Sequence, residues 1–243
     1  MTRKRWIFIA VTILLFLALL LGLILSKKIK INAWFAKNYD VFGIDVSHYQ
    51  GGIDWRKMEE QNLEFAFIKA TEGSSYVDEY FSDNWQEAGQ TKLYIGAYHF
   101  FSFDSAAKSQ AELYINTVGE LSGRLAPVVD VEYYGNKESN PPDREETVKK
   151  LKALLGILEE HYKVKPIIYT TYKVYNKYIK DEFTGYPLWI RNVYYPPDID
   201  IGGWTFWQYT DTAVLDGYDG DEKYIDKNVF YGSLEELKEL IVE

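Results

Sequence analysis

Two acidic residues stand two positions apart in the segment PVVDVE at residues 127–132. The apolar run predicts a buried strand, in which side chains i and i+2 share a face, so Asp130 and Glu132 should point the same way. Two neighbouring carboxylates repel each other when both are ionised, so one pKa should rise. A carboxyl group that keeps its proton near neutral pH can act as a general acid. Alone, the pair could equally be a strand end with two solvated acids.

Two further acids occupy comparable positions. Asp45 lies in the segment GIDVS at 43–47, and Asp226 lies in YIDKNVF at 224–230. In a barrel, the first and eighth strands are neighbours and the carboxyl ends of the strands share one rim. We therefore expect four carboxyl groups from three strands to converge on one mouth.

The elements that must position these acids alternate along the chain. Residues 143–162 carry apolar side chains at helical spacing, and 78–90 and 105–120 are also predicted helices. Helices become scarce after residue 165, so we predict an irregular β/α barrel of five βα units followed by three strands. At the end of the chain, Ser233 and Glu236 form a predicted capping box. The predicted strands are 41–47, 65–71, 94–100, 126–132, 166–171, 187–192, 204–209 and 224–230.

Composition narrows the class of protein. The chain has 243 residues, which suits one domain of about 200 residues with an appendage. Residues 1–40 hold seven basic residues and one acidic residue, which leaves 20 basic and 35 acidic residues for the remainder. A domain this acidic would repel phosphate, so we expect no nucleic acid partner. The chain has no cysteine, which excludes disulfides, thiol catalysis and Cys-based metal sites.

The appendage is an apolar N-terminal segment. Residues 6–26 contain no charged side chain and are long enough to span a bilayer core of about 30 Å as a helix. The run exceeds the apolar core of a signal peptide and no A-x-A-like site follows it, so we expect an uncleaved anchor. We divide the chain into a cytoplasmic stub and transmembrane helix (1–26), a juxtamembrane stem (27–40) and a catalytic domain (41–243).

The motifs along 41–232 resemble those of the family 25 glycoside hydrolases, the Chalaropsis-type lysozymes. As a set, and in this order, they are far more specific than an isolated Asp-x-Glu. They are GIDVSHYQ (43–50), FIKATEG (67–73), GAYHF (96–100), PVVDVE (127–132), IYT (168–170), LWI (188–190), WQYT (207–210) and IDKNVF (225–230).

The resemblance implies a muramidase that hydrolyses the β-1,4 bond between N-acetylmuramic acid and N-acetylglucosamine in peptidoglycan, without a cofactor or metal. Glu132 would be the general acid, and Asp130 would support the 2-acetamido group of the muramic acid. Asp45 and Asp226 would stabilise positive charge or position water. Retention and inversion both remain open. The expected substrate contacts are Lys69, Glu72, Tyr98, Tyr169, Trp189, Arg191 and Gln208.

Two positions depart from the family pattern. Arg191 stands where a small residue is usual, and Lys227 where an apolar one is common, so substrate preference is in doubt while the four acids are intact. The three histidines have no metal-ligand spacing. We interpret His48 and His99 as hydrogen-bonded structural residues and His161 as a surface residue at a helix end.

Two other functions compete with a muramidase. One is a non-catalytic peptidoglycan-binding scaffold, which loss of Asp130 or Glu132 would have favoured; the other is a glycosidase acting on chitin. A wall-cleaving domain must face outward, so we expect a monomeric, single-pass protein of a Gram-positive-type cell membrane. No separate wall-binding module is expected after the domain. Local opening of the wall for a wall-spanning assembly would suit such a tethered enzyme.

Overall fold

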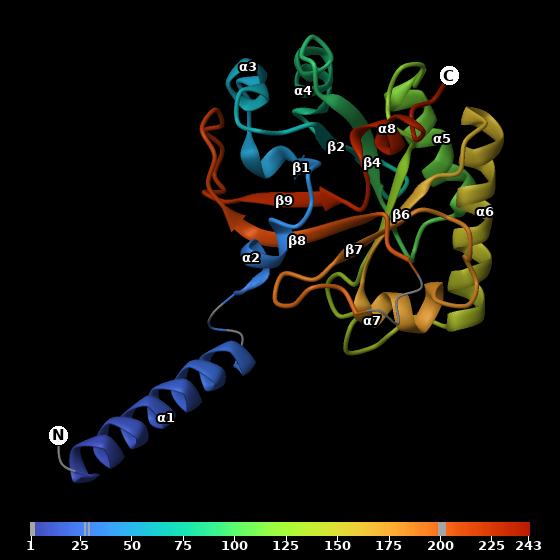
Figure 1. Cartoon of the computed structure of the whole chain (residues 1–243). Helices are drawn as coiled ribbons and strands as arrows, with labels where there is room; N and C mark the ends of the chain where they lie inside the picture. Colours follow the sequence, from blue (N-terminus) through green and yellow to red (C-terminus); the bar gives the residue numbers. More distant parts are fainter. Residues whose placement is uncertain (1–2, 27, 29, 199–202) are drawn as a thin grey trace.

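The computed structural model describes residues 3–26, 28, 30–198 and 203–243 (Figure 1). In these residues, eight strands close into a barrel because β1 pairs with both β2 and β9. The two-residue strand β3 (Tyr76–Val77) extends β2 outside the ring. In order around the barrel, the strands are β1 (Phe42–Val46), β2 (Phe65–Glu72), β4 (Tyr94–Phe100), β5 (Val128–Val131), β6 (Ile167–Thr171), β7 (Leu188–Arg191), β8 (Phe206–Ala213) and β9 (Ile225–Phe230).

Helical segments follow each of the first five barrel strands, whereas the described residues between β7, β8 and β9 contain none, which confirms five βα units followed by three strands. The short helix η1 (His48–Gln50) precedes the first of them, and α5 and α6 pack side by side along the barrel wall (Figure 1). The other loops carry shorter helices because little chain separates their strands. The segments are α3 (Trp55–Glu59), α4 (Phe81–Ala88), α5 (Ala107–Val118), α6 (Arg144–Tyr162), and α7 (Tyr172–Val174) with η2 (Tyr175–Ile179).

One detail of the predicted topology is wrong. We expected every strand to reach the mouth with its carboxyl end, but β9 runs antiparallel to both β8 and β1. Asp226 is the second residue of β9 and pairs with Asp45 near the end of β1. It therefore reaches the predicted rim because an antiparallel strand begins there.

The two faces of each strand belong to two cores. Val129 and Val131 point outward and are buried in the layer between the barrel and its helices. The barrel interior holds a second cluster that includes Phe65 and Phe67. These rings fit because Gly43 lies opposite Phe65, where a Cβ atom would stand 2.4 Å from the ring.

The end of the barrel opposite the mouth is closed by the C-terminal segment. Helix α8 (Leu234–Lys238) begins with the predicted capping box of Ser233 and Glu236, which is confirmed. Its Leu237 is fully buried in the interior cluster. Ile241 then forms a bridge to Leu125, at the foot of the barrel.

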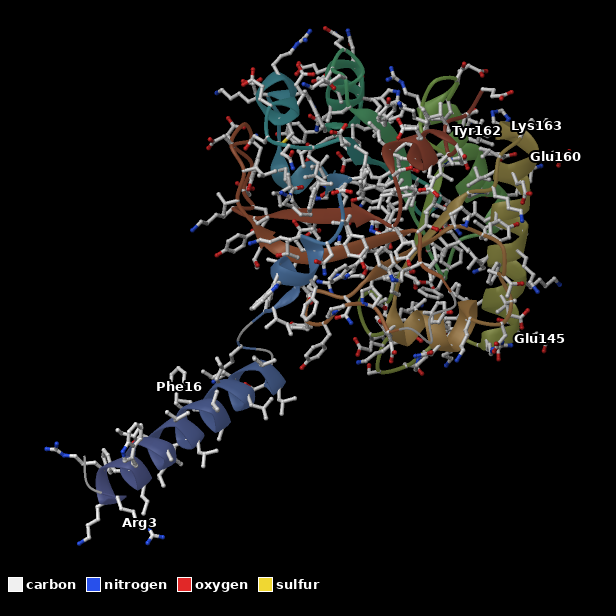
Figure 2. All side chains as sticks on the ribbon, viewed as in Figure 1. Arg3, Phe16, Glu145, Glu160, Tyr162 and Lys163 are labelled. Atoms are coloured by element: carbon white, nitrogen blue, oxygen red, sulfur yellow. The ribbon has the colours of Figure 1, made fainter. Side chains whose placement is uncertain are left out.

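The N-terminal segment forms a separate helix. α1 (Arg3–Leu25) has a mean hydropathy of 3.2 over its most apolar window and buries none of those residues, so it is long and apolar enough to cross a membrane. Hydrophobic segments of signal sequences share this property. Figure 2 shows its side chains, Phe16 among them, projecting all round the helix, which stands away from the barrel.

The chain after α1 packs onto the barrel. Helix α2 (Asn32–Ala36) lies between α1 and β8 (Figure 1). Asn32 is 1% exposed and donates hydrogen bonds to the carbonyl oxygens of Asn192 and Tyr209, at 2.6 and 3.0 Å. Residues 30–40 are thus attached to the globular body rather than hanging free of it.

Candidate active site

The mouth of the barrel gathers the four predicted acids. Asp45, Asp130, Glu132 and Asp226 line one cleft of about 200 Å³. A second hollow of about 190 Å³ shares Asp45, Asp226 and three other lining residues with the first, so the two are halves of one groove. A larger hollow of about 540 Å³ lies outside the barrel wall, between α3, α4 and residues 217–219, and contains none of these acids.

Asp45 and Asp226 form a buried carboxyl pair on adjacent strands. Asp45 accepts hydrogen bonds from the amides of Gln208, at 3.0 and 3.2 Å, and Asn228, at 2.8 Å. Burial and the charge of Asp45 raise the pKa of Asp226 to about 9, and Asp226 donates a hydrogen bond to Asp45. Burial also raises the pKa of Asp45, although these donors oppose the rise. These donors favour the ionised form of Asp45 over that of Asp226.

Asp130 and Glu132 form the second pair. Burial raises the pKa of Asp130 well above its ordinary value, and the charge of Glu132 adds to the rise. Burial also raises the pKa of Glu132, against the opposing charge of Arg191. Asp130 is 7% exposed, and among the described residues its Oδ1 atom has no hydrogen-bond partner. The pair thus combines two carboxyl groups whose protonated forms are favoured by burial with an unused acceptor in the cleft.

Some of the predicted substrate contacts line the cleft, and others hold a lining residue in place. Lys69, Tyr98, Tyr169 and Trp189 line the cleft beside the acids. Lys69 is held by Glu72, which is itself outside the cleft lining, through an ion pair of 2.8 Å.

Gln208 is 1% exposed and bridges two site residues. Its amide oxygen accepts a hydrogen bond from the Tyr169 hydroxyl at 3.0 Å, while its nitrogen reaches Asp45. Trp189, which is also buried, donates a hydrogen bond to Asn228 at 2.9 Å. Asn228 in turn donates a hydrogen bond to Asp45. These contacts orient the Asp45 carboxylate from two sides.

Several cleft residues were missed in the sequence. Ser47 and Tyr49 line both halves of the groove, and Tyr49 is 59% exposed there. Both stand in the GIDVSHYQ motif just after Asp45, and that position was an available signal. Asn228 follows Asp226 by two residues and so shares its face, which the strand periodicity could also have indicated. Asp211 also lines the groove, but no local pattern in the sequence indicates this.

The histidines serve the framework, as expected. The backbone N–H and the ring of His48 both contact the Asp78 carboxylate, at 2.9 and 3.0 Å. His99 lies between Thr71 and Gln110, and burial lowers its pKa to about 4, so its ring is neutral. His161 lies in the last turn of α6. In the described ranges, no group of three or more His, Asp or Glu side chains is arranged to hold a metal ion.

A closed β/α barrel with two carboxyl pairs in an open groove is typical of a glycoside hydrolase. The model of glycosyl hydrolases family 25 matches residues 44–218, and the chain belongs to that family of lysozymes and muramidases.

Known proteins of the family are similar over most of the chain. The structure of a family 25 glycosyl hydrolase from Bacillus anthracis is 52% identical, with a TM-score of 0.79, and the match covers 83% of this chain and 94% of that one. Lysozyme M1 of Streptomyces globisporus is 33% identical over 81% of this chain and 70% of its own length. The uncharacterised Escherichia coli protein YegX is 39% identical over 84% and 74%.

Proposed function

We propose that this cell-wall hydrolase cleaves the β-1,4 bond between N-acetylmuramic acid and N-acetylglucosamine, with Glu132 as the general acid. The observation that carries the proposal is the Asp130–Glu132 pair, whose two carboxyl groups share one face of a cleft where burial favours their protonated forms. A protonated Glu132 can deliver its proton to the glycosidic oxygen as the bond breaks.

Asp130 has a different role in this mechanism. Its buried Oδ1 lacks a partner in the described part of the chain, and an unsatisfied acceptor at such a place is costly until a donor arrives. The N–H of a 2-acetamido group is a donor of the right kind. Asp130 would hold this group so that its carbonyl oxygen can reach the anomeric carbon. The second pair would assist through Asp45, whose carboxylate stabilises positive charge developing on the sugar ring.

The test is digestion of purified sacculi by the full-length protein in detergent, followed by identification of the new reducing ends. Muramic acid ends are expected. N-acetylglucosamine ends, or no release of muropeptides at any pH between 4 and 8, would refute the assignment, and cleavage of chitin instead would favour the alternative polymer.

Glu132→Gln keeps the shape of the side chain and removes its proton. We expect kcat to fall at least about 10³-fold while binding to sacculi persists. Arg144→Gln, at an exposed position at the start of α6 and outside the cleft lining, is the matched control and should retain wild-type turnover. Near-normal turnover by Glu132→Gln would exclude this residue as the acid.

We further propose that α1 is an uncleaved, single-pass anchor that holds the domain, residues 41–243, on the outer side of the membrane. The length and hydropathy of α1 support it, as does a substrate that lies outside the cell. Local opening of the wall for a wall-spanning assembly would follow from such a tether. Fractionation should find the full-length chain in the membrane, whereas a shortened chain in the medium would show that α1 is removed.

A further inference from the structure

A series of charged side chains connects the segment after α1 to the catalytic mouth. Lys30, which precedes α2, forms an ion pair with one carboxylate oxygen of Asp211 on β8. The other oxygen of Asp211 accepts a hydrogen bond from the Arg191 guanidinium at 2.9 Å. All three side chains are about 30% exposed, so they are partly shielded from solvent. Asp211 also lines the half of the groove that contains Asp45 and Asp226.

Arg191 lies in the same layer of the barrel as Glu132. Asp130 is in register with Tyr169 on β6, and Tyr169 with Trp189 on β7. One step further along the same face, Thr171 is in register with Arg191, and Glu132 follows Asp130 by two residues. Two strand spacings of about 4.8 Å separate the backbones, and side chains that point inward converge. The positive charge of Arg191 therefore acts on the general acid, and it lowers the pKa of Glu132.

The backbone around Lys30 is held in place by contacts other than its ion pair. Asn32, two residues after Lys30, is buried and bonded to the backbone of Asn192 and Tyr209 on either side of the β7–β8 pairing. This attachment leaves Lys30 over Asp211 without relying on the ion pair itself. The segment from Lys30 to Asn32 thus has a defined place at the edge of the mouth.

We infer that residues 30–36 contribute to the catalytic mouth. In this arrangement, Lys30 fixes Asp211 and thereby positions Arg191 beside Glu132. Lys30, Asp211 and Arg191 are positioning residues, and the inference rests on the proposed role of Glu132. Arg191, which replaces the small side chain usual after LWI in the family, would then be part of a link between residues 30–36 and Glu132.

The proposed link predicts that two variants shift the pH dependence of kcat in opposite directions. Glu132 must be protonated to act, so activity is lost as the pH rises through its pKa. The other charged groups that act on the pair are Lys69, Asp45 and Glu72, and these stay unchanged in the variants below. Removing the positive charge of Lys30 leaves Asp211 uncompensated, which raises the pKa of Glu132. Removing the negative charge of Asp211 lowers it.

The experiment measures kcat and KM against pH for the full-length protein in detergent, with soluble glycan fragments of peptidoglycan as substrate. Lys30→Met should move the alkaline limb of kcat upward by about half a pH unit, and Asp211→Asn should move it downward by a similar amount. Lys37→Met, which removes the same charge from an exposed position of the same segment, should leave the limb in place. Lys30→Met added to Asp211→Asn should produce a clearly smaller shift than Lys30→Met alone, because only the direct effect of the Lys30 charge then remains.

Shifts of the same sign in both variants, or a Lys30→Met profile identical to that of Lys37→Met, would overturn the inference. A Lys30 effect of undiminished size without Asp211 would also overturn it, because the link would then bypass that residue. Equal thermal unfolding midpoints exclude a general loss of fold. If Glu132→Gln were active while the two shifts appeared, the proposed acid would be wrong but the link would still stand.

Discussion

The two ends of the barrel are built from the same strands but on opposite principles. The closed end is packed with aromatic rings, among which Phe67 contacts Phe65 and Phe206, and also Trp189 of the cleft wall, at centroid distances of 4.7–5.7 Å. The mouth, at the other end of the same strands, holds two carboxyl pairs whose pKa values are raised by burial.

The contrast separates stability from chemistry. Burial of apolar rings contributes free energy to folding, whereas burial of a carboxyl group costs free energy at any pH where the unfolded chain would ionise it. The closed end thus offsets the cost of the mouth. Three substitutions test this division, from the largest expected effect to the smallest.

Phe67→Ala should affect the closed end most. The ring is fully buried among three other aromatic side chains, so its loss leaves a cavity that rigid neighbours cannot fill. We expect a loss of about 3–5 kcal/mol in the free energy of unfolding, measured by denaturant titration. Phe35→Ala, on the exposed face of α2, is the control and should change it by less than about 1 kcal/mol. A small loss at Phe67 would show that the interior is loosely packed.

Asp226→Asn should stabilise the protein, with an effect that depends on pH. The raised pKa of about 9 means that the folded chain holds a proton that the unfolded chain releases above about pH 4. Wild-type stability should therefore fall as the pH rises from about 4 to 9, and the variant should escape this part of the fall. We expect a gain of about 1–3 kcal/mol at pH 8 and little at pH 4, from unfolding curves at both values. A gain that is equal at both pH values would contradict the proton linkage.

Tyr49→Ala should have the smallest effect. The ring lines both halves of the groove, is exposed, and lies 4.1 Å from the His48 ring, so it offers a face to a sugar without supporting the barrel. We expect KM to rise about three- to tenfold with kcat nearly unchanged, whereas Tyr49→Phe should remain close to wild type. A fall in kcat alone would instead indicate that Tyr49 acts at the reacting bond.

The strands were predictable because each has an apolar face with a period of two. Predicted ranges such as 94–100 and 143–162 agree with β4 and α6 to within one residue at either end. The direction of β9 was not predictable in this way, since a periodic pattern is the same read in either direction. Asp226 was nevertheless expected at the mouth, because the barrel makes the first and last strands neighbours.

The acids could be found from the sequence, but their partners could not. An Asp two residues before a Glu on an apolar strand is a local pattern. The contact of Lys30 with Asp211 spans 181 positions, and that of Gln208 with Asp45 spans 163. Such contacts depend on the register of strands and on where a loop returns, which no local spacing records. The different surroundings of Asp45 and Asp226, of which Asp45 has the amide donors, follow from those contacts.

The attachment of Lys30 to the rim also sets a working height for the enzyme. Leu25 ends α1, and Lys30 touches a residue of the groove five positions later. Five residues of fully extended chain cover at most about 18 Å. With α1 in a bilayer as proposed, the groove is confined to a shell a few nanometres deep over the membrane surface. An enzyme tethered as proposed would cut the innermost glycan strands and spare the outer wall, because the substrate must come to it.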